Sequence, residues 1–243
     1  MPTLLSVFGV EPNRIGGTET FARELSLQLA DRGWKSVLCF EKAPPPAVAK
    51  FLELPNVTVE VLANPTEPNW NATKRLAALL RQYKPEMLHL HFIGFIGLYP
   101  WLAKVLSTKK IFFTDHSSRP TGYVPARAPF WKRLLVRLIN YPITKVICVS
   151  KYGLHCMRAL DVLDDVRYEL VYNGVDLSRV VQDPVLGKNF RDRYQISSDK
   201  KVVVQVSWII PEKGIGQLLD VAKRVKTNGA NAQFLIVGDG PYR

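Results

Sequence analysis

Residues 3–40, TLLSVFGVEPNRIGGTETFARELSLQLADRGWKSVLCF, decide the fold. The apolar run Thr3–Phe8 is typical of a buried strand, and Lys35–Phe40 is a second β-rich run of the same kind. Between the two runs, residues 18–32 carry apolar side chains one helical turn apart and end at Gly33, a residue type that often follows a helix. The apolar residues of this helix are Phe21, Leu25 and Leu29. The stretch therefore predicts a strand, a helix and a second strand in succession.

The same alternation continues along the chain. Further apolar runs predict strands at residues 57–62, 87–91, 110–114, 145–149 and 168–172. Helical patterns lie between them at residues 71–84, 95–106, 130–140 and 151–160. Strands that alternate with helices in this way predict a doubly wound α/β fold with a parallel sheet. Ligands in such sheets bind outside the carboxyl ends of the strands, so the candidate site residues are sought there.

The length of 243 residues corresponds to one and a half domains of about 150 residues. We expect residues 1–176 to form one Rossmann-like domain and residues 177–200 to form a linker with a short helix near Phe190. Residues 201–243 offer two strands, 201–206 and 233–237, around a helix at 214–226. One helix cannot cover both faces of a parallel sheet. We therefore expect the last segment to be the start of a second Rossmann-like domain, in a chain truncated at its C-terminus.

Composition and charge limit the functional classes. A hydrophobic fraction of 47% with 22% charged residues excludes disordered and disulfide-scaffold classes. The sequence has three cysteines without metal-like spacing, no signal peptide and no long apolar run. These features predict a cytoplasmic protein that is soluble or peripheral to a membrane. The net charge of +12 favours anionic partners. No nucleic-acid-binding signature accompanies that charge, so nucleic acid is not an expected partner.

Gly16 and Gly17 lie between the first strand and the first helix. Glycines there let backbone amides approach a ligand at the helix N-terminus, where phosphate is favoured. The alternative is a tight turn without a ligand. The full G-x-G-x-x-G fingerprint is absent, which counts against an NAD enzyme.

Histidines follow two of the strands. His91 and His116 fall at carboxyl ends, on the edge where ligands bind. His89 is expected to be a packed, hydrogen-bonded core residue. A zinc site needs a third ligand and supporting carboxylates, and Asp115 is the only acid nearby in the sequence. We predict no metal site.

Two further segments carry positive charge. Lys213 and Gly214 precede the helix at 214–226, where a lysine beside a helix N-terminus can hold a diphosphate; a solvated surface lysine is the alternative. Residues 126–145, ARAPFWKRLLVRLINYPITK, combine basic and apolar residues without an acid. This composition suits an interfacial helix on an anionic membrane surface. We favour the competing interpretation, a helix packed on the sheet with a basic outer face.

Read in order, several motifs together resemble family 4 glycosyltransferases, enzymes of the two-domain GT-B fold. The resemblance rests on seven stretches: GGTE (16–19) with DRGW (31–34), PEMLHLH (85–91), TDH (114–116), VICVS (146–150), VYNGVD (171–176), PEKG (211–214) and VGDGP (237–241). The resemblance implies an enzyme that transfers a sugar from a nucleotide-sugar to a glycan, lipid-linked or small-molecule acceptor with retention of anomeric configuration. It also implies that no metal or other cofactor is required.

The resemblance also assigns roles to residues. Gly16 and Gly17 would bring the helix N-terminus to the donor diphosphate and the acceptor, and His91 would belong to the same site. His116 would hydrogen-bond the donor sugar near the reacting carbon. Lys213, with Gly214, would stabilise the negative charge that grows on the leaving diphosphate, an effect worth roughly 10²–10³ in rate per donor group.

Two departures from the family pattern accompany the resemblance. Ser207-Trp208 stands where the family commonly has Gly-Arg, and the sequence ends before the family's Glu-x7-Glu region. Two alternatives therefore stay open. One is a nucleotide-sugar epimerase or hydrolase of the same fold, for which His116 with Asp115 offers the only proton-transfer pair. The other is a non-catalytic, acceptor-binding half that needs a partner chain.

Overall fold

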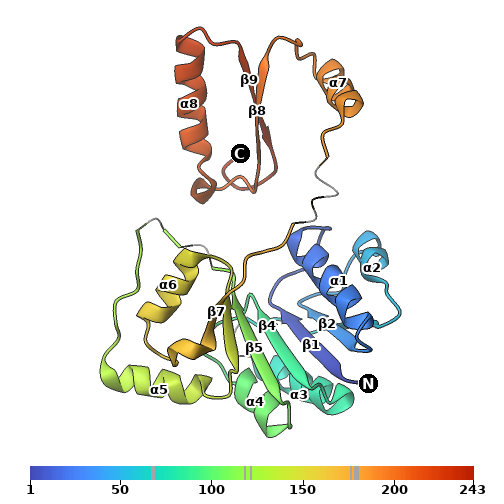
Figure 1. Ribbon diagram of the computed structural model, residues 1–243, viewed down its shortest axis with the longest axis vertical. Helices are drawn as coiled ribbons and strands as arrows, with labels where there is room; N and C mark the ends of the chain where they lie inside the picture. The colour runs from blue at the N-terminus through green and yellow to red at the C-terminus, as the bar shows by residue number, and fades with distance from the viewer. Residues whose placement is uncertain (67–68, 118, 121, 176, 178–180) are drawn as a thin grey trace. The chain divides into compact units, whose positions relative to one another are not determined.

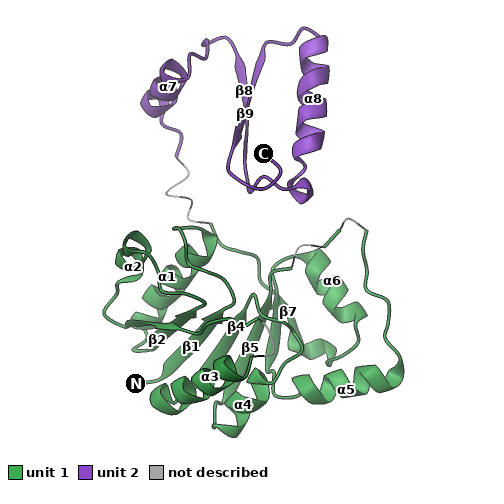
Figure 2. Ribbon diagram, turned by 180° about the vertical axis from the view of Figure 1, so that it is seen from behind, with its two compact units in different colours: residues 1–175 green, residues 176–243 purple. Residues whose placement is uncertain are grey.

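The computed structural model of the protein describes residues 1–66, 69–117, 119–120, 122–175, 177 and 181–243. The chain divides into two compact units, Met1–Val175 and Asp176–Arg243, which Figure 2 shows in different colours. Asp176, where the sequence predicts the end of the first domain, lies outside the described residues. The segment expected to be a linker holds helix α7 (Pro184–Arg193), which belongs to the second unit.

Unit 1 contains a sheet of seven parallel strands within the described residues (Figure 1). The strands are β1 (Thr3–Phe8), β2 (Lys35–Phe40), β3 (Val57–Val61), β4 (Met87–His91), β5 (Lys110–Asp115), β6 (Lys145–Cys148) and β7 (Tyr168–Leu170). Their order is β3-β2-β1-β4-β5-β6-β7. Because the order reverses between β1 and β4, the loops after these two strands run to opposite sides, and a ligand crevice is expected at their carboxyl ends. The predicted α/β fold with a parallel sheet is confirmed.

Helices cover both faces of this sheet. They are α1 (Gly17–Ala30), α2 (Pro46–Leu52), α3 (Trp70–Tyr83), α4 (Tyr99–Val105), α5 (Phe130–Asn140) and α6 (Lys151–Ala159), with a short 3₁₀ turn, η1 (Asp165–Arg167). The larger core cluster joins Leu5 and Leu88 of the strands to Leu76 of α3. The smaller cluster joins Phe8 and Phe40 to helices α1 and α2. Burial of both sheet faces explains why the strands are rich in apolar residues.

Two element predictions differ from the structure. The helix expected at 95–106 begins only at Tyr99, because the segment before it contains Gly94 and Gly97, and Pro100 occupies the first turn, where proline is tolerated. Helix α2 begins at Pro46, in a proline-rich stretch for which the sequence predicted no element. Proline fixes the backbone angle that a first helical residue needs, so here it starts a helix.

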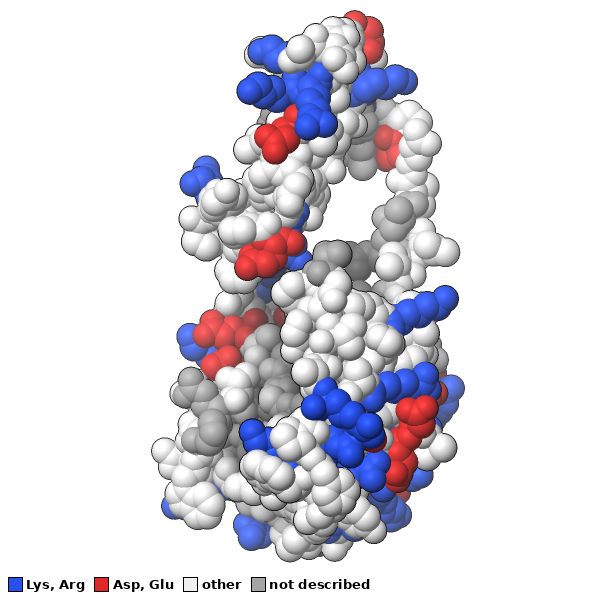
Figure 3. Space-filling view, turned by 90° about the vertical axis from the view of Figure 1, so that its left-hand side faces the viewer, with Lys and Arg blue, Asp and Glu red and all other residues white. Residues whose placement is uncertain are grey.

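Helix α5 has the predicted bounds, but its expected packing is wrong. Its apolar side chains lie in solvent: Phe130 is 72% and Trp131 62% exposed, and Asn140 alone is buried among its residues. The basic residues Arg127, Arg133 and Arg137 instead pair with Asp161, which follows α6. Figure 3, which views the side of unit 1 carrying α5 and α6, shows charged side chains of both signs lying together beside an uncharged surface.

Unit 2 contains a two-stranded parallel sheet, β8 (Lys201–Val206) and β9 (Ala232–Val237), with α8 (Ile215–Thr227) and a 3₁₀ turn, η3 (Pro211–Lys213). Several apolar side chains of β8 are exposed, including Val203, Val204 and Val206. Gly238 and Gly240 have φ of 154° and 157°, and a Cβ at either would overlap the backbone at Ser207 or Ile209. The loops after β8 and β9 therefore pack tightly on one another.

Candidate active site

The expected crevice at the ends of β1 and β4 lies beside a close backbone approach. The Gly9 amide donates to the His91 carbonyl at 2.9 Å, and a Cβ at Gly9 would overlap the Phe92 carbonyl oxygen. Phe92 itself has φ of 54°, a conformation that costs energy in a non-glycine residue. This turn directs the Phe92 ring onto His116, with ring centroids 4.1 Å apart.

His91 and His116 meet at this crevice. His91 Nδ1 lies 3.1 Å from His116 Nε2, so one ring donates a hydrogen bond to the other. The His91 ring stacks on Phe8 at 4.6 Å and meets the edge of Phe21, from the second turn of α1, at 5.4 Å. His116 is half-buried, whereas His91 is buried. The structure therefore brings together two of the predicted site residues and places them beside α1.

Burial controls the charge of these rings. It lowers the pKa of His91 well below the usual value, and repulsion from His89 and His116 lowers it further. Burial also lowers the pKa of His116, against an opposing effect of the Asp115 carboxylate. Both rings are therefore neutral at neutral pH, and each keeps one N–H donor and one acceptor. The His91 Nε2 atom is buried and makes no hydrogen bond to any residue that the structure describes.

His89 has a structural role, as expected. Its ring is buried, and His89 Nε2 lies 2.7 Å from the Thr114 hydroxyl on the neighbouring strand. Burial lowers its pKa to about 3, with a smaller contribution from His116. Among the described residues, no group of three or more histidine, cysteine or acidic side chains is placed to hold a metal ion.

Gly16 and Gly17 lie at the N-terminus of α1. Gly16 precedes the helix, and its amide donates to the Glu19 carboxylate at 2.9 Å. The first-turn amides that follow have no partner within the helix. No atom lies within 4 Å of where a Cβ on Gly17 would be, so the protein's own packing leaves open space there. A ligand phosphate could enter that space and receive hydrogen bonds from these amides.

The loop after β5 is held by an ion pair that the sequence did not reveal. Asp115 is buried; its carboxylate accepts from Arg119 at 2.8 Å and from the Ser117 amide at 3.1 Å. The pair packs against Gly153 in α6, where a Cβ would lie 3.5 Å from Asp115 Oδ2. Because Asp115 is engaged with Arg119, it is not free to act with His116 as a proton-transfer pair.

Lys213 and Gly214 belong to unit 2. Lys213 ends η3 with an exposed side chain, and its carbonyl accepts from the Gln205 side chain at 2.7 Å. Gly214 directly precedes α8 and has φ of 73°, a left-handed conformation that favours glycine. The lysine is therefore anchored through its backbone while its ammonium group stays available to an anion.

Two sequence profiles of known families match the chain. A sequence profile described as Glycosyltransferase Family 4 matches residues 15–179, and one described as Glycosyl transferases group 1 matches residues 188–243. The phosphatidylinositol N-acetylglucosaminyltransferase gpi3 subunit of Schizosaccharomyces pombe is 32% identical over 133 residues, which are 54% of this chain and 26% of that protein.

Two solved structures share the fold. A glycosyltransferase from Rickettsia africae gives a TM-score of 0.75 at 19% identity and covers 98% of this chain and 60% of its own. Anabaena Alr3699/HepE, in complex with UDP and glucose, gives 0.69 at 16% identity and covers 100% of this chain and 62% of its own. The chain thus spans less than two thirds of the length of these proteins.

Proposed function

Because the chain belongs to glycosyltransferase family 4, we propose that it transfers a sugar from a nucleotide-sugar to an acceptor with retention of anomeric configuration. The family match favours transfer over the epimerase or hydrolase alternative, as does the engagement of Asp115 with Arg119. The observation that carries the proposal is the contact of His91 and His116 beside α1, at the crevice where the strand order reverses. The Anabaena protein of the same fold, solved with UDP and glucose, supports a nucleotide-sugar donor.

Each unit separately offers one contact for a phosphate group. The open space at Gly17 admits a phosphate to the N-terminal amides of α1. Lys213, with Gly214, would supply the positive charge that stabilises the leaving diphosphate. A helix N-terminus and a lysine ammonium group each carry positive charge of their own, so the proposal includes no metal. We expect transfer to continue at an unchanged rate after chelation of divalent cations.

His116 would act as a neutral hydrogen-bond partner of the donor sugar. Its ring is fixed by stacking on Phe92 and by the bond to His91, so little reorganisation accompanies the reaction. If His91 donates from Nδ1 to His116 Nε2, then His116 presents its Nδ1–H as a donor. His91 is a positioning residue in this scheme, because it is buried behind His116.

The site is tested by measuring sugar transfer with the complete gene product and a set of nucleotide-sugars. His116→Ala should lower turnover by roughly 10²-fold, as loss of one preorganised donor does. His155→Ala, which changes an exposed histidine of α6, is the matched control. Unchanged turnover in His116→Ala would remove that residue from the mechanism. A product of inverted anomeric configuration, detected by NMR, would refute retention.

The role of Lys213 has its own test. Lys213→Ala should weaken binding of the nucleoside diphosphate, because a charged contact is lost. Lys223→Ala, which changes another exposed lysine within α8, should leave binding unchanged. Equal affinities for the two variants would show that Lys213 is a solvated surface lysine.

The exposed apolar face of α5 supports a lipid-linked acceptor at an anionic membrane surface. None of the helices in the described residues is long and apolar enough to cross a membrane. The face nevertheless offers Phe130, Trp131 and Leu134 to solvent, with Lys132 over the Trp131 ring at 5.2 Å. Such a combination binds anionic interfaces by apolar insertion and charge attraction. The fission yeast relative is named for transfer to phosphatidylinositol, which agrees with a lipid acceptor.

Membrane binding is tested by sedimentation with anionic vesicles. Trp131→Ser should reduce the bound fraction several-fold, because burial of an aromatic ring is lost. Trp70→Ser is a close control: Trp70 is 67% exposed, and Lys74 lies over its ring at 5.5 Å. Equal loss of binding in both variants, or none in either, would contradict docking through α5.

A second candidate is an acceptor-binding half completed by a partner chain. The exposed apolar residues of β8 favour it, because parallel strands are ordinarily covered on both faces. Transfer by the purified gene product alone would exclude this candidate. Activity that appears only after a second polypeptide is added would establish it.

A further inference from the structure

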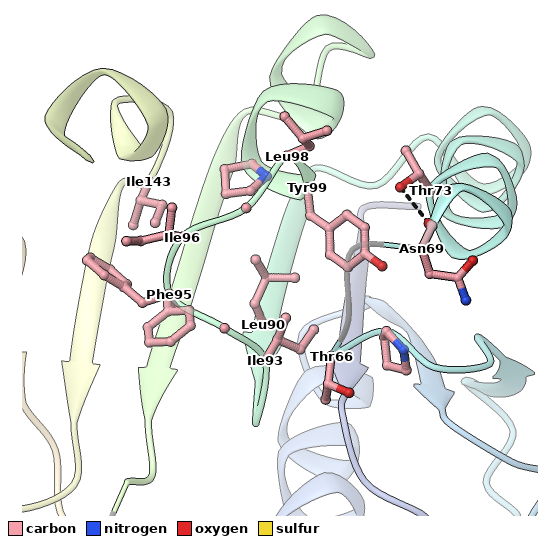
Figure 4. A pocket seen from close by; sticks show the side chains of 15 residues that line it. Thr66, Asn69, Thr73, Leu90, Ile93, Phe95, Ile96, Leu98, Tyr99 and Ile143 are labelled. Carbon is pink, nitrogen blue, oxygen red and sulfur yellow. Dashed lines mark hydrogen bonds between the residues drawn. The ribbon is translucent and has the colours of Figure 1, made fainter. Parts of the chain in front are cut away.

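A cavity of about 210 Å³ lies in unit 1 between the sheet and the loop that joins β4 to α4 (Figure 4). Leu90 and Phe113 line it from neighbouring strands, and Tyr99 lines it from α4. Among the residues that the structure describes, none of those lining the cavity is charged. Leu90 alternates with His91 along β4, so the cavity lies on the face of the sheet opposite the candidate active site.

The cavity has one polar end and one apolar end. Tyr99 is only 8% exposed, and its hydroxyl makes no hydrogen bond to any residue among those described. In Figure 4 this hydroxyl lies at the same end as Thr66 and Asn69, whereas Phe95 and Ile143 lie at the other. A buried hydroxyl without a partner costs about 1–3 kcal/mol, so a ligand oxygen at that end would recover a hydrogen bond.

The size and opening of the cavity suit a hydrocarbon chain. Ile96 and Leu98 both line the cavity and are more than half exposed, which gives it an apolar path to the surface. A dry cavity of about 150 Å³ accommodates benzene, so this one has room for about eight carbon atoms. Water is a poor occupant of the apolar end, because a buried water needs two to four polar partners.

We propose that this cavity binds a neutral amphiphile, an acyl chain attached through an ester. The Tyr99 hydroxyl donates a hydrogen bond to the ester carbonyl, and the chain extends toward Phe95 and Ile143. A carboxylate or phosphate headgroup does not fit, because the lining supplies no positive charge to offset its desolvation. Binding here is independent of the sugar-transfer proposal, since no residue of the candidate active site takes part.

The test is calorimetric titration of the protein with 1-octanoylglycerol, below the concentration at which it forms micelles. The wild type should show saturable binding at one site. Tyr99→Phe should bind the ester about threefold to tenfold more weakly, because it loses one hydrogen bond to the ligand. Tyr168→Phe is the matched control, because Tyr168 is 6% exposed, its hydroxyl also lacks a partner among the described residues, and it does not line the cavity. Its affinity should equal that of the wild type.

Two further measurements keep the proposal falsifiable. Octanoate, with the same chain and a negative charge, should bind at least tenfold more weakly than the ester. Ile93→Trp, which fills the cavity from its lining, should abolish binding while retaining the circular dichroism spectrum of the wild type. Absence of saturable binding to the wild type, equal affinity of Tyr99→Phe, equal affinity for octanoate, or binding that survives in a folded Ile93→Trp would each overturn the proposal.

Discussion

Lowering the pH should destabilise unit 1 through its buried histidines. Burial lowers the pKa of His89 to about 3 in the folded protein, against an ordinary value of about 6.5. Below about pH 6.5, the unfolded chain therefore binds a proton at this ring that the folded protein does not. The stability that the neutral ring contributes is present above that pH and is lost as the pH falls toward 3.

The size of the effect follows from the shift in pKa. Between about pH 7.5 and pH 5, His89 alone should reduce the free energy of unfolding by about 2 kcal/mol, since each unit is worth about 1.4 kcal/mol. His91 has its pKa lowered in the same direction and adds to the loss. A domain with a total stability of about 5–15 kcal/mol would lose a large part of it.

The assay is urea unfolding, followed by circular dichroism at several pH values, for the wild type and for His89→Gln. Glutamine can still hydrogen-bond Thr114 but does not titrate, so the variant should lose about 2 kcal/mol less than the wild type between about pH 7.5 and pH 5. His155→Gln removes an exposed histidine and should follow the wild type. If the wild type and His89→Gln lose equal stability over this interval, the assigned cause of the pH dependence is wrong.

Three further predictions concern backbone fit and charge pairing. Gly9→Ala should destabilise unit 1 by at least about 2 kcal/mol in urea unfolding, because its Cβ overlaps the Phe92 carbonyl oxygen; a difference below about 0.5 kcal/mol would contradict the close approach. Gly17→Ala should leave the free energy of unfolding unchanged or raise it by up to about 1 kcal/mol, since no atom occupies the space of the added methyl group and alanine favours a helix. The variant's affinity for a nucleoside diphosphate should fall. Unchanged affinity would exclude an anion at the N-terminus of α1. Asp161→Asn should lower the melting temperature, since it loses pairing with Arg127, Arg133 and Arg137; an unchanged value would mean that these pairs are offset by hydration.

Much of the fold follows from the sequence, because its strands are buried on both faces. The runs Thr3–Phe8 and Lys35–Phe40 are mostly apolar, and their bounds match β1 and β2. Local sequence patterns predict the bounds of helices less well near glycine and proline. These residues affect a helix through the turn that they form before it. The sequence predicts that the helix after β4 begins at residue 95, whereas α4 begins at Tyr99. The apolar periodicity of a helix continues through the loop before α4, which contains Gly94 and Gly97.

The packing of α5 could not be predicted from its composition. The sequence shows that apolar and basic residues alternate, but not which face meets the rest of the domain. The pairing with Asp161 answers this question: Asp161 lies about thirty residues from Arg127 and Arg133 along the chain, and it holds both side chains while apolar side chains of α5 stay exposed. A partner at such a sequence distance leaves no local signal, so the exposed apolar face emerged only from the structure.

The candidate site was found in part because it sits at strand ends. His91 and His116 could be expected at the same edge of the sheet, but their contact depends on the backbone at Phe92, where φ is positive. The sequence indicates that turn through Gly9, since a glycine directly after a buried strand often marks a close backbone approach. The pairing of Asp115 with Arg119 was missed, because an aspartate beside a histidine equally suits proton transfer.

Strand β4 links the two proposals physically. Its residues alternate between faces, so His89 and His91 point to the site where α1 begins, whereas Leu88 and Leu90 point to the core and the cavity. A shift of one residue in the pairing of β4 with β1 would exchange these sets and bury both imidazoles among leucines. The free energy needed to bury the imidazoles among leucines keeps β4 in its observed register. The leucines on one face of β4 therefore also keep its histidines on the other face, where α1 begins. A conservative change at Leu90 should therefore alter amphiphile binding directly, and sugar transfer only as far as the strand itself moves.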